Sequence, residues 1–309
     1  IGIGLGMALP VIGKHGTPQQ IEKFVDETLK GELTWCQLFS EPSAGSDLAA
    51  VRTRAVKDGD AWVVNGQKVW SSWAHHSDWG ILVVRTDPGV VKHKGLTFFV
   101  VDMKSPGIDV RPIRQISGAS DFNETFLADV RIPESDMVGG VGEGWACCMT
   151  VLTGERLSQG EKGKIASLMD YAADTPADEG TQLDDASVKL ALATAYAEEQ
   201  AQNYLQARLR TMVSRGESPG ALAAMMKLSY ASRLQKTSAL AMEIRGAGAL
   251  AIEADDSVTG EIWHDYIWAS ALRIAGGADE VLRNQIAERV LGMPGEMRAD
   301  KGVPFSELK

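Results

Sequence analysis

The amino-acid sequence predicts an α+β fold in which a small antiparallel β domain, either a pair of sheets or a barrel, lies between helical regions. Residues 34–135 contain several short runs of β-branched and aromatic residues, separated by turn residues and without helical periodicity between them. Capped helical patterns precede these runs and follow them. We therefore divide the chain into a remnant of an N-terminal helical domain (1–33), a middle β domain (34–140) and a C-terminal four-helix bundle (141–309).

The clearest helix signal near the start covers residues 17–30. Thr17 suits an N-cap, Pro18 suits the first helical position, Gln20 completes a capping box and Gly31 can end the helix. The preceding apolar run carries no charge and is too short to span a membrane, so we interpret it as the middle of another helix. We expect the chain to be a fragment of a longer protein that lacks most of its N-terminal helices.

Five short segments carry the β signal. In Trp62-Val-Val-Asn-Gly-Gln-Lys-Val-Trp70, the pair Asn65-Gly66 predicts the two-residue turn of a hairpin. The other predicted strands are Ile81–Arg85, Leu96–Val101, Ile108–Pro112 and Asn123–Arg131. Because no helices separate them, we expect antiparallel pairing.

The second half of the chain reads as helical. An acidic loop containing a proline covers 172–185, and Asp184 or Asp185 can cap the helix that follows it. Ser218 and Pro219 can open a further helix. We expect four long helices, at about 145–171, 185–214, 219–244 and 279–291.

Composition excludes several classes of function. The net charge is -10 with no compensating run of Lys or Arg, so no nucleic-acid partner is expected. The five histidines lack metal-ligand spacing, and no membrane span is expected. Cys36, Cys147 and Cys148 suit reduced, buried thiols of a cytoplasmic protein, and no base is placed to make Cys36 a nucleophile.

Several segments resemble the acyl-CoA dehydrogenase family, in the family's order, from about Ile12 to Pro294. The most specific is Gln37-Leu-Phe-Ser-Glu-Pro-Ser-Ala-Gly-Ser-Asp47, followed by Lys68-Val-Trp-Ser-Ser-Trp-Ala74. The segments Lys94–Val100, Asn123–Pro133, Arg273–Arg283 and Ile286–Gly292 complete the match. The style of these motifs resembles an actinobacterial subgroup that includes sterol-degrading heterotetrameric members.

This resemblance implies FAD as the cofactor, held mainly by backbone groups at the edge of its ring. By resemblance, Leu38, Phe39 and Ser40 lie along the pyrimidine edge, Trp70 covers one face and Ser72 lies near N5. Ser46 would reach a phosphate of the cofactor or of the substrate. The full set of residues expected to bind the cofactor is Gln37, Leu38, Phe39, Ser40, Ser46, Trp70, Ser71, Ser72, Glu243 and Gly246.

The resemblance also implies α,β-dehydrogenation of an acyl-CoA thioester. A carboxylate removes a proton beside the carbonyl while flavin N5 accepts a hydride. The glutamate that many members carry before a Gly-Thr pair is replaced here by Gly276, which cannot take a proton. Other members carry the base directly before an arginine on the first bundle helix, and Glu155-Arg156 fits that pattern. We expect Glu155 to be the base and Arg156 to shape the substrate site.

Two departures from the family pattern leave alternatives open. The stretch that often grips the pyrophosphate of a neighbour's flavin is here the acidic segment 174–185, and Glu243-Ile-Arg-Gly-Ala-Gly248 matches only partly. The chain could therefore be a low-activity partner subunit of a heterotetramer, or an acyl-CoA oxidase. The expected partners are acyl-CoA, an electron-transfer flavoprotein or similar acceptor, and other subunits of a homo- or hetero-tetramer.

Overall fold

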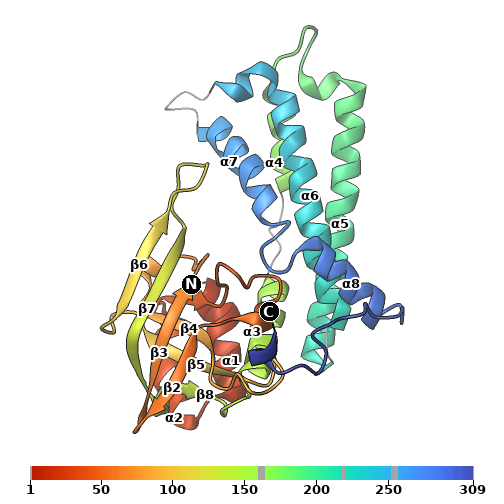
Figure 1. The fold of residues 1–309 in the computed structure, drawn as a ribbon. Helices are drawn as coiled ribbons and strands as arrows, with labels where there is room; N and C mark the ends of the chain where they lie inside the picture. Colours follow the sequence, from red (N-terminus) through yellow and green to blue (C-terminus); the bar gives the residue numbers. More distant parts are fainter. Residues whose placement is uncertain (1, 159–163, 218–219, 252–256, 309) are drawn as a thin grey trace. The chain divides into compact units, whose positions relative to one another are not determined.

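The computed structural model describes residues 2–158, 164–217, 220–251 and 257–308. The chain forms two compact units. The first contains Ile1–Ser158 together with Glu296–Lys309, and the second contains Gln159–Gly295. Each unit is described separately below (Figure 1).

The first unit begins with helices. A π-helical turn, η1 (Gly4–Ala8), continues into α1 (Leu9–His15), and α2 (Pro18–Lys30) follows. Thr17 and Gln20 form the expected capping box, and Gly31 ends α2 in the left-handed conformation, so this prediction is confirmed. The Gln20 amide also donates to the carbonyls of Ser135 and Met137, at 2.8 Å each, which ties α2 to the end of the sheet.

An eight-stranded sheet forms the centre of the first unit (Figure 1). Its strands are β1 (Trp35–Leu38), β2 (Arg54–Asp58), β3 (Ala61–Lys68), β4 (Trp79–Arg85), β5 (Leu96–Asp102), β6 (Ile108–Ile113), β7 (Phe122–Pro133) and β8 (Met137–Val138). The spatial order is β6-β7-β3-β2-β4-β5-β8, and β1 also pairs with β4. The pairings β1–β4 and β2–β4 are parallel, so the sheet is mixed and the expectation of an entirely antiparallel domain is wrong. The chain forms the β2–β3 hairpin before it returns to the sheet as β4. As a result, β4 runs parallel to both β1 and β2.

The predicted hairpin turn at Asn65-Gly66 is also wrong. The strand β3 runs straight through these residues, and the turn between β2 and β3 lies at Gly59 and Asp60. The register of β3 against β7 shifts between Val64 and Gly66, which marks a β-bulge. A Cβ at Gly66 would lie 2.3 Å from Thr53 Oγ1, so glycine is required there by close backbone approach rather than by a turn.

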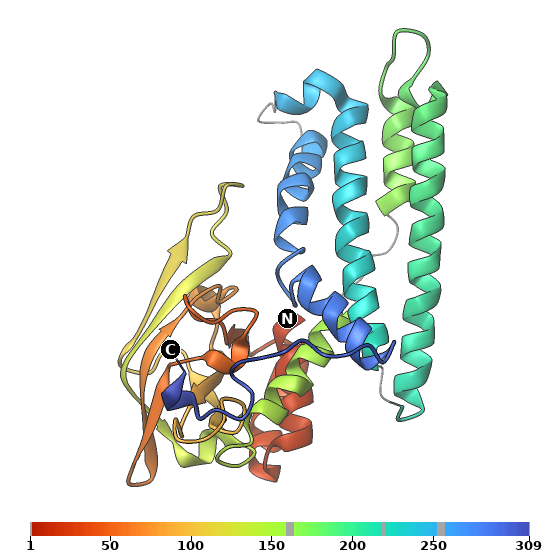
Figure 2. The same cartoon turned by 45° about the vertical axis from the view of Figure 1, so that its right-hand side comes forward.

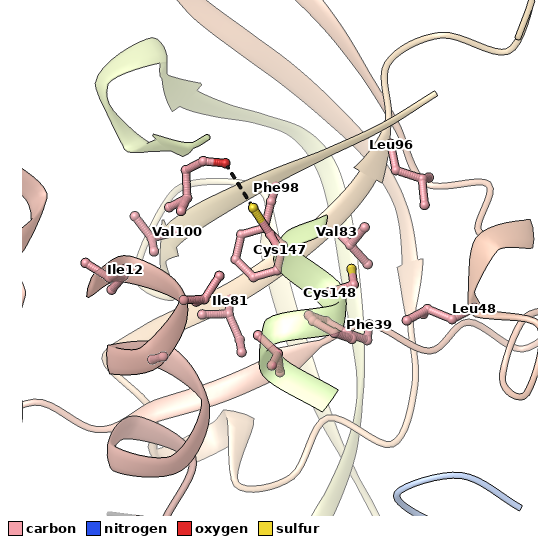
Figure 3. Packing of buried hydrophobic residues seen from close by; sticks show 14 of the residues in the cluster. Ile12, Phe39, Leu48, Ile81, Val83, Leu96, Phe98, Val100, Cys147 and Cys148 are labelled. Carbon is pink, nitrogen blue, oxygen red and sulfur yellow. Dashed lines mark hydrogen bonds between the residues drawn. The ribbon is translucent and has the colours of Figure 1, made fainter. Parts of the chain in front are cut away.

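Two hydrophobic clusters fill the first unit, and successive side chains at the end of β1 belong to different clusters. Leu38, the last residue of β1, belongs to the cluster with Trp62, Leu82 and Phe99, whereas the next residue, Phe39, belongs to the other cluster. Figure 3 shows the cluster that contains Phe39, in which Cys147 and Cys148 pack with Phe39, Ile81 and Phe98. The three cysteines are free and buried, as the sequence predicts.

The helix α3 (Gly144–Ser158) belongs to the first unit and packs on β5, α1 and η1. A Cβ at Gly154 would lie 2.3 Å from the carbonyl oxygen of Gly6, so α3 and η1 touch through backbone at that point. Where one helix was predicted for 145–171, the structure describes α3 and α4 (Lys164–Asp174). Residues 159–163 between them lie outside the described part of the chain.

The second unit is helical (Figure 2). It contains α4, α5 (Ala186–Ser214), α6 (Gly220–Arg245), α7 (Ser257–Ala271) and α8 (Asp279–Arg289). Asp185 caps α5 by accepting from the amides of Ser187 and Val188, as predicted, whereas Ser218 and Pro219 lie outside the described residues. The sequence analysis missed α7, which is rich in aromatic and β-branched residues and contains Gly260.

Buried polar groups join α5 to α6. The guanidinium of Arg233 donates to Gln202 Oε1 at 2.9 Å and to Glu199 Oε2 at 3.2 Å, and all three residues are buried. These contacts fix the register of the two long helices.

Candidate flavin site

A buried ion pair connects the two motifs that the sequence singled out. Lys68 Nζ lies 2.8 Å from Glu41 Oε1, and the two side chains are 0% and 5% exposed. The same ammonium donates to the carbonyl oxygen of Phe39 at 3.0 Å. The end of β3 is thereby bound to the backbone that follows β1.

Glu41 also holds a third segment in place. Its carboxylate accepts hydrogen bonds from the amides of Arg52 at 2.6 Å and Thr53 at 2.9 Å. Burial alone would raise the pKa of Glu41, but Lys68 and these donors hold it below its usual value, so the carboxylate is ionised. Three donors on one buried carboxylate satisfy most of its hydrogen-bonding capacity.

The turn after β3 has an unusual backbone. Trp70 and Trp73 both have positive φ, 59° and 57°, a conformation that residues other than glycine adopt rarely. The indole of Trp70 is 57% exposed and meets Phe122 edge-on. An exposed tryptophan in a strained turn is poorly explained by core packing, and it offers a flat apolar face to a ligand.

Asn123, at the start of β7, holds this turn from both sides. Its carbonyl accepts from the Ser71 amide at 3.1 Å, and its side-chain amide donates to the Ser71 carbonyl at 2.8 Å. Both residues are fully buried. The amide of Trp73 donates to the carbonyl of Asp121 at 2.8 Å, so the turn is anchored at two successive places.

The two motif segments meet at Ser40. The amide of Val69 donates to the Ser40 carbonyl at 2.9 Å, which places Ser40 beside the residue that precedes Trp70. Among the described residues, the backbone amides of Ser40, Gly45, Ser46 and Ser72 have no hydrogen-bond acceptor. The hydroxyls of Ser40, Ser46 and Ser72 are at least partly exposed.

This donor set fits a flavin. The ring of a flavin presents several acceptors along one edge and two flat faces, and its phosphates are anions. Backbone amides and serine hydroxyls suit the acceptors and phosphates, and the Trp70 indole suits a face. Gly45 has open space around its Cα, so a large ligand can approach the backbone there.

Some predicted cofactor residues can contribute only backbone atoms. The side chains of Leu38 and Phe39 lie in the two cores, and Ser71 is fully buried. Gln37 is half-buried on β1. A ligand at this site would therefore contact the main chain at residues 38 and 39.

Glu155 lies on α3, on the same helix face as Cys148, which is fully buried in the core of the first unit. Burial raises the pKa of the Cys148 thiol, and the Lys68 ammonium opposes this rise. Glu155 follows Cys148 by seven residues, which is two turns along the same helix face, or about 10 Å. Glu155 is half-buried, whereas the side chain of Arg156 lies outside the described residues.

Glu243 and Gly246 belong to the second unit, and their assignment to the cofactor stays a prediction. Glu243 is exposed near the end of α6, and Gly246 has a φ of 60°. Part of the acidic stretch is explained locally, because Asp184 accepts from Thr181 and Asp185 caps α5. These contacts lower the pKa of both carboxyls and keep them anionic.

Glu41, Lys68 and Asn123 lie within the family motifs, but their structural roles were not predicted from the sequence. A lysine at the end of a predicted strand could have indicated a buried pair. Cys36 is unsuited to act as a nucleophile, because burial raises the pKa of its thiol to about 12 and so disfavours the thiolate.

The described residues contain no group of three His, Cys, Asp or Glu side chains that could hold a metal ion. None of the helices that the structure describes is long and apolar enough to cross a membrane.

Comparison with known proteins identifies the class. Residues 36–130 match the middle domain of acyl-CoA dehydrogenases, and residues 142–291 match their C-terminal domain. The chain belongs to the acyl-CoA dehydrogenase family, whose members in general depend on a flavin.

Individual relatives come from mycobacteria. The chain is 41% identical to the acyl-CoA dehydrogenase FadE34 of Mycobacterium tuberculosis over 290 residues, which are 93% of this chain but 39% of that protein. It therefore spans about two fifths of the length of FadE34. It is 38% identical to the acyl-CoA dehydrogenase IpdE1 of the same organism, covering 94% of this chain and 74% of that one.

Two solved structures extend the likeness to the fold. The Tcur3481-Tcur3483 steroid ACAD gives a TM-score of 0.86 at 31% identity, over 95% of this chain and 77% of that one. The ChsE4-ChsE5 complex from Mycobacterium tuberculosis gives 0.85 at 31% identity, over 95% and 78%. Both confirm the acyl-CoA dehydrogenase-like fold that the motifs predict.

Proposed function

We propose that this chain carries out FAD-dependent α,β-dehydrogenation of an acyl-CoA thioester, with Glu155 as the base. The observation that carries the proposal is the cradle formed by Ser40, Ser46, Trp70 and Ser72, held together by the buried Lys68–Glu41 pair. Family membership supplies the chemistry that such a cradle serves.

The residues of the cradle bind and orient. A flavin held there would supply the acceptor for a hydride from the β-carbon of the acyl group, which would leave an enoyl thioester as the product. The backbone amides of Ser40 and Ser72 are available to the polar edge of the ring, and Trp70 covers a face. The amides of Gly45 and Ser46 are available to a phosphate.

Glu155 would remove the α-proton. A carboxylate becomes an effective base for such a weak acid when it is partly shielded from water, and Glu155 is half-buried. Its position two turns beyond Cys148 directs it along the helix face that contacts the sheet. Gly276, with a φ of 69°, occupies the other family position for the base and has no side chain to ionise.

The substrate proposed is a bulky acyl-CoA, branched or bearing a ring. Gly276 lacks a side chain where many family members carry a glutamate. A relative of the same fold is described as a steroid ACAD. The electron acceptor proposed is an electron-transfer flavoprotein or a similar protein.

A flavin spectrum followed by a substrate screen tests this proposal. Purified protein should show flavin absorbance, and a set of acyl-CoA thioesters should reduce an artificial acceptor with bulky thioesters turning over fastest. Peroxide formation measured in the same assay separates a dehydrogenase from an oxidase. A flavin-loaded protein that reduces no acceptor with any thioester would contradict the proposal.

A second candidate is a partner subunit of a heterotetramer with little activity alone. It is supported by the acidic segment 174–185, which is unsuited to a neighbour's pyrophosphate, and by the relative described as a ChsE4-ChsE5 complex. This candidate predicts colourless protein when the chain is expressed alone and yellow protein when a homologous partner is co-expressed. Yellow, active protein from the chain alone would exclude it.

A further inference from the structure

Residues 296–308, here called the strap, return to the first unit after the helices of the second. The strap lies along the loop between β4 and β5. Val91 and Pro304 form an antiparallel bridge, the amide of Phe305 donates to the Val90 carbonyl at 2.8 Å, and the amide of Ser306 donates to the Pro88 carbonyl at 2.8 Å.

The ring of Phe305 covers a buried cation. The guanidinium of Arg85 lies 3.5 Å from the ring centroid, and both residues are buried. Arg85 donates to the carbonyls of Val51, Ala49 and Lys92, so it joins the segment after the flavin motif to the β4–β5 loop. Arg85 is 3% exposed, and this burial lowers its pKa to about 10.

Lys92 links the strap to the flavin motif itself. Its ammonium lies 2.6 Å from Asp47, the last residue of the motif, and also pairs with Asp300 of the strap. The Lys92 side chain is 10% exposed. Because two carboxylates neutralise it, Lys92 is suited to holding Asp47 in place rather than to binding a phosphate directly.

We propose that Asp300, Phe305 and Lys92 are positioning residues for the phosphate-binding end of the cradle. Lys92 and Asp300 hold Asp47, and Phe305 packs on Arg85, which donates to the Lys92 carbonyl. Through these contacts they set the amides of Gly45 and Ser46 that face the ligand. This proposal rests on the proposed function. The ligand chemistry is a phosphate oxygen, from either the flavin cofactor or the CoA part of the substrate.

The first test needs no ligand. Hydrogen exchange in the full chain should show faster exchange of the Ala44 and Ala50 amides, which donate to the carbonyls of Glu41 and Asp47 at 3.0 and 2.9 Å. We expect the increase to be about tenfold or more in Asp300→Asn and in Phe305→Ala. Glu307→Gln is the matched control, because Glu307 is an exposed acid of the same strap that forms no ion pair with another described residue. Unchanged exchange of the Ala44 and Ala50 amides in both variants would overturn the proposal.

The second test separates the two phosphate sources. If the cofactor phosphate is held there, Asp300→Asn weakens FAD binding about tenfold; if the CoA phosphate is held there, it raises KM for acyl-CoA with kcat within about twofold. Equal effects of Asp300→Asn and Glu307→Gln on both constants would contradict the proposal. Native protein that binds no flavin would contradict the proposed function instead, and the exchange test would still judge the strap.

Discussion

Lys68 and Glu41 form an ion pair that is almost completely buried, with 2.8 Å between Nζ and Oε1. The pair connects β3 to the Glu41–Asp47 segment, and Glu41 extends the connection to the amides of Arg52 and Thr53. Removing one partner would leave a buried charge without compensation. The geometry of the cradle therefore depends on two residues whose side chains need not touch the ligand.

Lys68→Met should destabilise the protein by about 3–5 kcal/mol, because it leaves Glu41 buried and unpaired. The control is Lys57→Met, which removes an exposed pair of Lys57 with Glu134 at 2.6 Å and should cost about 1 kcal/mol or less. Urea unfolding of both variants measures the difference. Similar losses in the two would show that the buried pair has no special role.

Acid should weaken the native state through Glu41. Its folded pKa is held below the usual value of 4.5, so its contribution to stability is complete above that pH and is lost as the pH falls through the folded value. The free energy of unfolding should therefore decrease as the pH falls below about 4.5. Glu41→Gln should be less stable at neutral pH and less sensitive to acid, and an unchanged acid slope would rule out this assignment.

Asn123→Ala should weaken flavin binding. The variant loses the hydrogen bond from Asn123 Nδ2 to the Ser71 carbonyl, which supports the strained turn at Trp70. The Ser71 carbonyl keeps the Ala74 amide as a donor at 3.4 Å, so the loss of this one hydrogen bond should cost about 0.5–1.5 kcal/mol. Flavin titration and thermal melts measure both effects. Asn65→Ala, which removes an exposed amide bound to Asp129, is the control and should leave flavin affinity unchanged.

Gly154→Ala should lower both stability and activity. Its Cβ would meet the Gly6 carbonyl at 2.3 Å, so α3 must move away from η1 and carry Glu155 with it. Overpacking of this kind costs about 1–3 kcal/mol. Gly13→Ala in α1 is the control, because nothing lies within 4 Å of its added Cβ. It should stabilise the protein by up to about 1 kcal/mol, and melting temperatures that moved together would refute the close-contact explanation.

The sequence predicted those features that depend on local chemistry. The capping box of α2 and the Asp185 cap of α5 are set by side chains within three residues of the amides they accept from. The motif segments of the cradle also follow the sequence order of the family.

Features set by distant contacts were predicted less well. The Asn65-Gly66 pair is typical of a turn, but Gly66 serves a close approach to Thr53, which no local rule reveals. The parallel direction of β1 against β4 depends on a crossover of the chain. The partnership of Lys68 with Glu41 spans 27 positions and could be inferred only from the improbability of a buried lysine.

The central claim is that Glu155 is the base of a flavin-dependent dehydrogenation, and the rate of flavin bleaching by acyl-CoA without oxygen tests it most directly. In flavin-loaded protein, Glu155→Gln should retain the cofactor but slow the bleaching by on the order of 10²–10⁴-fold, because the amide cannot accept the α-proton. A Glu155→Gln protein that keeps its flavin and is bleached at the native rate would contradict the account.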